Sequence, residues 1–324
     1  MQFKQLFAAA AIALLAPVSY AASAPAADFP KHEARLIVPF PAGGPTDVLA
    51  RMVAEGLNKK WGQAVVVDNK PGAGTMIGAS IVAKAPPDGY TFGITITAYT
   101  INPAIRTTMP YDTLKDLTGI TQLAQANMAL VARPDLPFNS VAELVEYARK
   151  NPGKLTYATP GVGTGTHLAG EMFKKEAGID ILHVPYNGSG PALTDVLGGR
   201  VDLMFDILYS VQPHLNSGKL KVLALTTSKR DSSAPTIPTI AETLPGFQVY
   251  STIGLVAPAA TPAPVISKIQ HDVAEFLAQP DTKKRFEALG VTPVGSSPDA
   301  WNALIRSEIQ RWTKVARESK ITVQ

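Results

Sequence analysis

The sequence predicts an α/β protein of two lobes, in which each lobe has a mainly parallel sheet flanked by helices. Two observations predict this architecture. Short apolar runs alternate with segments of helical period along nearly the whole chain. A glycine-rich turn between an apolar strand and an amphipathic helix also occurs twice, as PAGGPTDVLAR at residues 41–51 and as TPGVGTGTHLAG at residues 159–170. The two turns fall in different halves of the chain, and we therefore expect one turn in each lobe.

The first series of elements precedes and follows the first turn. We expect strands at residues 36–38, 64–67 and 91–96. Apolar residues at helical spacing after the first turn predict a helix between the first two strands, and residues 75–83 form the next crossover.

The second series begins near Met128 and includes the second turn. We expect strands at residues 128–132, 155–158, 182–184, 202–205 and 221–226, with helices at residues 140–150, 166–176 and 190–197. Two helical patterns close the chain after proline-rich stretches.

The chain is expected to cross between the lobes twice, near residues 124–128 and 249–253. These crossings predict a discontinuous lobe 1 of residues 22–125 and 250–324, and a lobe 2 of residues 126–249. Two crossings side by side make a hinge, and a hinge allows the lobes to close on a ligand.

The N-terminal segment predicts export. Lys4, an apolar stretch at residues 6–15 and small residues before Ala22 indicate a signal peptide at residues 1–21. No stretch approaches the roughly 20 apolar residues of a membrane helix, so we expect no membrane insertion. The chain has no cysteine, which excludes disulfides, thiolate metal sites and a lipid-attachment cysteine. We expect a monomer in the periplasm.

The overall charge gives no indication of nucleic-acid binding. The formal net charge is only +4, and its positive charges are dispersed along the sequence. We therefore expect no nucleic-acid partner.

The first turn combines features of an anion site built from backbone. The first N–H groups of a helix have no internal partner, and the helix dipole places partial positive charge there. Gly43 and Gly44 permit positive φ and close ligand approach, and Pro45 suits the first helical turn. Asp47 stabilises the helix start. The alternative reading is a tight structural turn with a capping aspartate.

The second and third turns add polar groups. Gly161 and Gly163 flank Thr164, and of Thr164 and Thr166 we expect one to cap the helix and the other to donate to a carboxylate. A third turn, at residues 185–191, again precedes a helix with a proline near its start. Asp206 ends a predicted strand, where open α/β sheets bind ligands, although a capping role is equally compatible with its position.

The sequence lacks the motifs of nucleotide-binding, catalytic and metal sites. No Gly-Lys-Ser/Thr follows either turn, which excludes a phosphate loop, and GAGTMIG at residues 72–78 is one residue too long for a dinucleotide fingerprint. Ser189 is not in a nucleophile elbow, and the five histidines show neither metal spacing nor a triad pattern. We expect no cofactor, no metal and no catalytic residue.

The quoted turns resemble those of a known family. Together with VVVDNKPGAGTMIGA, PPDGYTFGI and HVPYNGSGPALTDVLGGRVDLMFD, they make the chain similar to the extracytoplasmic receptors of tripartite tricarboxylate transporters, the Bug family. The resemblance runs in order over nearly the whole chain after the signal. It implies a type II periplasmic binding protein that closes over a small carboxylate and hands it to membrane permease subunits.

The resemblance also implies where the ligand is bound. In that family, backbone amides, hydroxyls and ordered water at the strand-to-helix turns bind the carboxylate of the ligand. Thr46 and Thr164 occupy positions where hydroxyl donors are expected. With the cleft candidates named from the sequence, the expected ligand-binding residues are Phe40, Ala42, Gly43, Gly44, Thr46, Asp47, Tyr99, Pro160, Gly161, Gly163, Thr164, Thr166, His167, Tyr186, Asn187, Gly188 and Asp206.

The expected function is a periplasmic solute receptor rather than an enzyme. The alternatives are a periplasmic hydrolase or transferase that uses Ser189 or His167, and a solute sensor for a histidine kinase. The cleft candidates include aromatic residues but no arginine or lysine. Such a pocket suits one carboxylate on a neutral or aromatic body better than citrate.

Overall fold

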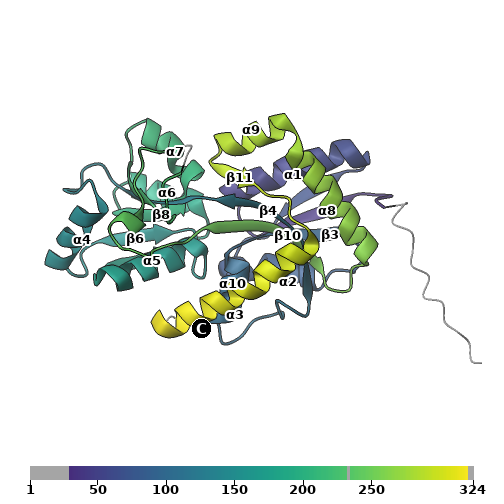
Figure 1. Ribbon diagram of the computed structural model, residues 1–324, viewed down its shortest axis with the longest axis horizontal. Helices are drawn as coiled ribbons and strands as arrows, with labels where there is room; N and C mark the ends of the chain where they lie inside the picture. Colours follow the sequence, from purple (N-terminus) through teal and green to yellow (C-terminus); the bar gives the residue numbers. More distant parts are fainter. Residues whose placement is uncertain (1–28, 232–233, 320–324) are drawn as a thin grey trace, which may run out of the picture.

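The structure is a computed structural model that describes residues 29–231 and 234–319. The predicted signal peptide, residues 1–21, lies outside the described residues. Two lobes lie side by side, each with its own sheet covered by helices (Figure 1). The two-lobed α/β class is therefore as expected.

The first sheet has six strands in the order β11-β4-β10-β3-β1-β2. Its strands are β1 (Ala34–Val38), β2 (Val65–Asn69), β3 (Thr91–Ile96), β4 (Leu117–Ala126), β10 (Ser251–Pro258) and β11 (Val291–Pro293). The helical segments of this lobe are α1 (Pro45–Trp61), η2 (Ala73–Thr75), α2 (Met76–Ala83), α3 (Ala98–Ile105), α8 (Ala263–Ala278), α9 (Pro280–Ala288) and α10 (Pro298–Ser319).

The second sheet has five strands in the order β7-β6-β8-β5-β9. Its strands are β5 (Met128–Ala132), β6 (Thr156–Thr159), β7 (Leu182–Pro185), β8 (Leu203–Ile207) and β9 (Lys221–Leu225). The helices that accompany it are α4 (Val141–Lys150), α5 (Gly165–Ala177), α6 (Ser189–Leu197) and α7 (Leu208–Asn216), and η3 (Ile240–Glu242) follows.

Both sheets are mixed, although most strands of each sheet run in the same direction, as expected. β1 is parallel to β2 and β3, and β6 is parallel to β7 and β8. β10 runs antiparallel to β3 and β4, and β5 runs antiparallel to β8 and β9. β11 is also antiparallel to β4, and every antiparallel pair of the described sheets includes β4, β5 or β10, the strands next to the crossings. A strand that enters from the other lobe needs no helical crossover, so it is free to pair in either direction.

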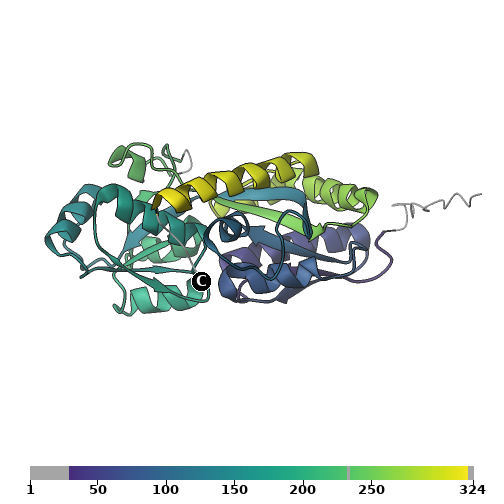
Figure 2. The ribbon, with the colours of Figure 1, turned by 90° about the horizontal axis from the view of Figure 1, so that it is seen from below.

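Expected element boundaries mostly differ from the structure by one or two residues. β3 and β5 have the expected ends, whereas β2 runs to Asn69 rather than ending at residue 67. The closing segment has three helices instead of two, because Pro280 starts α9 directly after α8. α10 extends from the first lobe toward the second (Figure 2), and its Trp301 and Trp312 side chains are buried.

The two segments that join the sheets lie against each other. β4 leads through Asn127 into β5, and Thr226 follows β9 on the return path. The Thr226 hydroxyl donates to the Val249 carbonyl at 2.7 Å, and the Thr226 N–H donates to the Met128 carbonyl at 2.9 Å. Among the described helices, none combines the length and the apolar character that crossing a bilayer requires.

Candidate functional site

A cleft of about 390 Å³ lies between the lobes, at the carboxyl ends of strands from both sheets. Its walls come from the turns that follow β1, β6, β7 and β8, with Ile96 and Leu289 at the side. The predicted site residues that line it are Phe40, Ala42, Gly43, Gly44, Thr46, Pro160, Thr164, Thr166, Gly188 and Asp206. The cleft size falls within the range of small-molecule sites.

A smaller cavity of about 290 Å³ adjoins the cleft and shares Phe40, Pro160 and Thr164 with it. The predicted residues that line only this cavity are Gly161, Tyr186 and Asn187. Arg106, at the end of α3, also lines it. Its guanidinium group donates to Asn102 Oδ1 at 3.0 Å.

The first turn is held by Asp47, which is buried but does not line the cleft. Its carboxylate accepts hydrogen bonds from the Gly43 N–H at 2.9 Å, Arg51 Nε at 2.8 Å and Asn69 Nδ2 at 2.9 Å. Burial alone would raise the pKa of Asp47, but these hydrogen bonds outweigh burial and hold the pKa below its usual value. Asp47 therefore stabilises the turn from behind, and the residues that it positions line the cleft.

Thr46 is the side chain of this turn that faces the cleft with an available hydroxyl. Its side chain is buried, and no described residue hydrogen-bonds to its hydroxyl. Pro45 begins α1, so the helix presents the Thr46 N–H as its first free donor. One hydroxyl and one backbone donor thus point from lobe 1 to the same region.

The second turn places the start of α5 opposite the start of α1. Thr164 is the N-cap, and its Oγ1 accepts from the His167 N–H at 3.3 Å. Thr164 Oγ1 also lies 2.7 Å from the Gly161 carbonyl and 2.8 Å from Thr166 Oγ1. The expectation that one of the two threonines caps the helix is therefore confirmed for Thr164, and both threonines line the cleft.

Glycines at the turns allow the lobes to approach closely. Gly163 has φ of +80°, and a Cβ there would lie 2.8 Å from Asn102 Oδ1 of the other lobe. Gly188 has φ of +119°, and a Cβ there would lie 3.2 Å from Pro41 Cδ. A side chain at Gly163 would be strained and would also clash across the cleft.

Asp206 lies at the end of β8 and is 1% exposed. Its carboxylate accepts from Ser189 Oγ at 3.0 Å, Ser210 Oγ at 2.6 Å and the Ile207 N–H at 2.7 Å. Burial raises the pKa of Asp206 to about 6, although the hydrogen bonds from Ser210, Ser189 and Ile207 oppose the shift. Ser189, Ser210 and Tyr209 line the cleft beside it, and none of the three was predicted as a ligand-binding residue.

His167 lies behind the second turn rather than in the cleft. Its Nδ1 accepts from the Gly163 N–H at 3.2 Å, and its ring stacks on His183 with centroids 4.4 Å apart. Burial lowers the pKa of His167 to about 4 and that of His183 to about 3. Both rings are therefore neutral near pH 7, and His167 supports the turn from the back.

Tyr99 does not belong to the cleft. Its ring is buried, and its hydroxyl donates to the Thr113 carbonyl at 2.9 Å, in a separate cavity beside α10. The reason is that α3 begins at Ala98, directly after β3. Tyr99 therefore lies in a buried helical turn, and the expectation that it lines the cleft was wrong.

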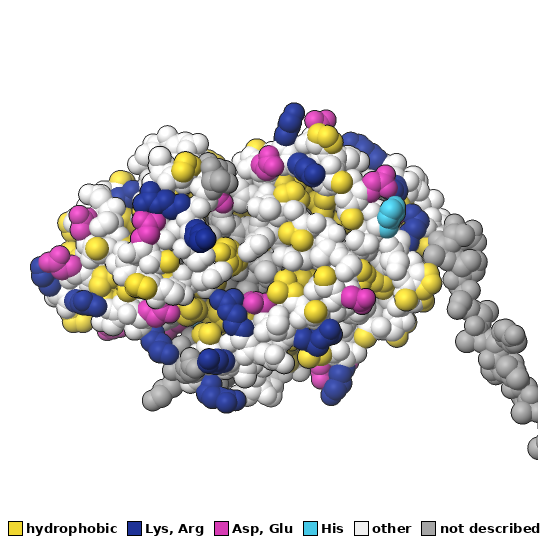
Figure 3. All heavy atoms as spheres, viewed as in Figure 1, with side chains coloured by type: hydrophobic (Ala, Val, Ile, Leu, Met, Phe, Trp, Pro, Cys, Tyr) yellow, Lys and Arg dark blue, Asp and Glu magenta, His cyan; other side chains and the backbone are white. Residues whose placement is uncertain are grey.

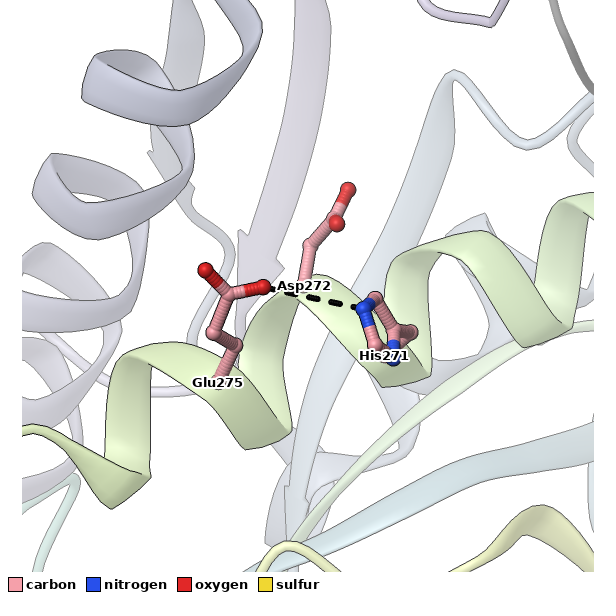
Figure 4. Close-up of side chains that lie close together, drawn as sticks. All are labelled: His271, Asp272 and Glu275. Carbon is pink, nitrogen blue, oxygen red and sulfur yellow. Dashed lines mark ion pairs between the residues drawn. The ribbon is translucent and has the colours of Figure 1, made fainter.

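A cluster on α8 has the composition of a metal site. His271, Asp272 and Glu275 lie together there, and a dashed line in Figure 4 joins His271 to Glu275. Asp272 pairs with Lys60 at 3.2 Å and with Lys268 at 2.5 Å. Glu275 also pairs with Lys60. Two ammonium groups already neutralise these carboxylates, so the cluster is an ion-pair network of the surface.

The visible face of the molecule carries interspersed charges. In the space-filling view, basic and acidic side chains alternate over both lobes without a broad field of one sign (Figure 3). The lobes are hollowed between them, where mostly uncharged atoms are seen. This face therefore has a cleft of a size that suits a small molecule, and it has no continuous surface of one charge.

Fold and cleft together define a two-lobed solute-binding protein of the type II periplasmic class. Residues 49–321 match the family model described as "Tripartite tricarboxylate transporter family receptor". The chain belongs to this family, whose members include the Bug proteins. Family and structural neighbours are binding proteins, so the alternative of a periplasmic enzyme is rejected.

Three solved structures are similar over nearly their full length. Rpa4515 of Rhodopseudomonas palustris with adipate is 39% identical, with a TM-score of 0.88, covering 91% of this chain and 99% of that one. The periplasmic binding protein BugD is 35% identical, with a TM-score of 0.87 and coverage of 91% and 100%. MatC (Rpa3494) of R. palustris with bound malate is 33% identical, with a TM-score of 0.84 and coverage of 89% and 99%.

Proposed function

We propose that this protein is an exported periplasmic receptor that captures a small organic carboxylate between its lobes and delivers it to the permease of a tripartite tricarboxylate-type transporter. The observation that carries this proposal is the meeting of the α1 and α5 starts, from different lobes, at one cleft. Free N–H groups and helix dipoles at both starts favour an anion. The carboxylates in the Rpa4515 and MatC structures support the same ligand class.

The proposed mechanism is closure about the two crossings. Lobe 1, residues 22–125 and 250–324, moves as one rigid body, and lobe 2, residues 126–249, moves as the other. A ligand that touches both helix starts gains contacts in the closed state that the open state lacks, so it shifts the population toward closure. The permease then distinguishes the closed, loaded receptor from the open one.

A binding screen tests the ligand class. The protein lacking residues 1–21 is melted with monocarboxylates, dicarboxylates, tricarboxylates, amino acids and aromatic acids, and with neutral sugars and divalent metals as controls. A ligand at 100 times its dissociation constant stabilises the fold by about 2.7 kcal/mol, which a thermal-shift assay detects. Stabilisation by a sugar or a metal with no response to any carboxylate would refute the proposal.

Delivery is tested separately from binding. Membrane vesicles that contain the matching permease subunits are supplied with labelled ligand, with and without the receptor. We expect uptake only with receptor present. Binding without receptor-dependent uptake would favour the role of a sensor over that of a transport receptor.

A further inference from the structure

We propose that Arg106 is a specificity-determining residue of this receptor, which binds a second carboxylate of the ligand in the cavity that adjoins the cleft. This inference rests on the proposed function and adds what the binding site requires of the ligand's other end. In this arrangement, the helix starts in the main cleft bind one carboxylate through backbone and hydroxyl donors, and the guanidinium group binds the other.

The adjoining cavity shares part of its wall with the cleft. Phe40, Pro160 and Thr164 line both spaces, whose volumes are about 390 Å³ for the cleft and about 290 Å³ for the adjoining cavity. Both spaces also take walls from both lobes, since the adjoining cavity is lined by residues 71–75 of lobe 1 and 185–187 of lobe 2. A ligand that extends past the shared side chains therefore reaches the second cavity.

The two cavities differ in charge. Among the described residues, no lysine, arginine or histidine lines the cleft, whereas Asp206 does. The adjoining cavity has the opposite composition, because Arg106 lines it and no described aspartate or glutamate does. Burial lowers the pKa of Arg106, yet a guanidinium group stays charged in proteins. The expectation of a single carboxylate considered only the predicted cleft residues, and Arg106, at the end of α3, was not among them.

Arg106 is held where the two lobes meet. Its Nε donates to Asn102 Oδ1 at 3.0 Å, and Asn102 Nδ2 donates to the Gly74 carbonyl at 2.8 Å. A Cβ at Gly74 would lie 3.0 Å from Arg106 Nη2, and a Cβ at Gly163 of the other lobe would lie 3.7 Å from the same atom. Nη2 therefore lies between a loop of lobe 1 and the second turn of lobe 2. A carboxylate bound there contacts both lobes and favours the closed state.

The loop before α2 supports an anion in the same cavity. Thr75, the N-cap of α2, lines the cavity, and no side-chain hydrogen bond caps this helix start. The helix dipole therefore places partial positive charge beside the cavity. Ala73 and Thr75 also have positive φ, of +47° and +81°, which is unfavourable for residues other than glycine. Backbone strain of this kind is concentrated at sites that bind ligands.

Matched ligands test the inference by calorimetric titration at about pH 7.5. The probes are succinate, adipate and terephthalate, each compared with its own monoamide. The amide keeps the size and shape of the second carboxylate and removes its charge. In at least one pair, we expect the dianion to bind about tenfold or more tightly than the monoamide. The reason is that a charge-assisted, bidentate hydrogen bond between guanidinium and carboxylate is stronger than a hydrogen bond to a neutral amide.

Arg106→Gln provides the variant arm, with Arg285→Gln as its matched control. Arg285 belongs to α9 of the same lobe, is exposed, pairs with Glu55 and lines neither cavity. We expect the preference for the dianion over its monoamide to shrink about tenfold in Arg106→Gln and to persist in Arg285→Gln. The affinity for the monoamide should stay within about threefold of the wild type in both variants, because its single carboxylate is bound in the main cleft. If Arg106→Gln fails to fold, Arg106→Met, which also removes the charge, replaces it.

The outcomes separate the inference from the proposed function. If no carboxylate of these pairs or of the wider screen binds, the proposed function itself fails. If every monoamide binds as tightly as its dianion, or if the variants at Arg106 keep the preference for the dianion, the inference is overturned while the carboxylate receptor stands. An equal loss of affinity for dianion and monoamide in these variants would assign Arg106 a structural role at the contact between the lobes, and it would overturn the inference in the same way.

Discussion

At the scale of single residues, side chains at the cleft divide into those that face it and those that hold its turns. Thr46 and Thr166 face the cleft, whereas Asp47 and His167 lie behind it and fix the two glycine turns. The sequence suggested all four as contacts, because a residue near a turn looks the same in sequence whether it faces the ligand or the core. Only packing separates these roles.

Replacing Thr46 with valine should weaken ligand binding without weakening the fold. The change keeps the shape of the side chain and removes a hydroxyl that no described residue uses. We expect the dissociation constant of a bound carboxylate to rise about tenfold, since a hydrogen bond to a charged group contributes about 1.5 kcal/mol or more. Calorimetric titration measures affinity, and urea unfolding measures stability.

The control for this change is Thr113→Val. Thr113 is also buried, and its hydroxyl has no partner among the described residues, but it lies outside the cleft. We expect the Thr113→Val variant to bind the carboxylate with the same affinity as the wild type. Equal affinities in both variants would remove Thr46 from the site.

At the scale of elements, each glycine turn has two structural roles. It ends a strand and starts a helix with free N–H groups, and it lets the opposite lobe come close. The first role, ending a strand and starting a helix, is local and follows from the residue types. The second appears only in contacts such as that between Gly163 and Asn102, which are 61 residues apart in the chain.

Gly163→Ala should impair closure more than folding. The new Cβ would meet Asn102 Oδ1 at 2.8 Å, and the residue already has positive φ. We expect about 1 kcal/mol of lost fold stability from the backbone strain and at least a tenfold loss of affinity from the clash. Small-angle scattering with saturating ligand should show a less compact molecule than the wild type.

Gly178→Ala is the matched control at the other end of α5. Gly178 also has positive φ, of +62°, but nothing lies within 4 Å of a Cβ placed there. We expect a similar loss of stability with unchanged affinity. If Gly163→Ala also keeps its affinity, close approach at this turn is not needed for binding.

At the scale of the whole molecule, buried ionisable groups make stability depend on pH. His167 and His183 have pKa values near 4 and 3 in the fold, below the usual value of 6.5. Burial is the main cause of both lowered pKa values, Lys174 adds to it and Glu171 opposes it, so both rings are neutral near pH 7. Because the unfolded chain takes up protons that the fold cannot, stability is full above about pH 7 and is lost as the pH falls below 6.5. Asp206 acts in the opposite sense between pH 6 and 4, since its pKa is raised.

Stability should therefore fall between about pH 7.5 and pH 5. Two histidines outweigh one aspartate, and we expect a net loss of about 2 kcal/mol in urea unfolding over this interval. His183→Asn should flatten the dependence, whereas His271→Gln, at an exposed histidine, should keep it. A wild-type stability that stays constant over this interval would contradict the assignment of neutral histidines.

Much of this protein is determined by sequence alone. The alternation of apolar runs with helical periods specifies α/β, and the glycine turns specify helix starts with free N–H groups, because both depend on the properties of adjacent residues. The ordered motifs specify the family, and β3 and β5 were predicted to the residue. Ten predicted site residues line the main cleft, and all of them except Asp206 lie in or beside the turns that join strands to helices.

Only the tertiary structure decided the rest. The antiparallel pairing of β5 and β10, the burial of Tyr99 within α3, and the roles of Ser189, Tyr209 and Ser210 around Asp206 depend on which segments meet in space. No local pattern encodes such meetings, because they result from packing two lobes around two crossings. Sequence therefore determined the fold class, the family and the helix starts beside the cleft, and tertiary structure determined which side chains line the rest of that cleft.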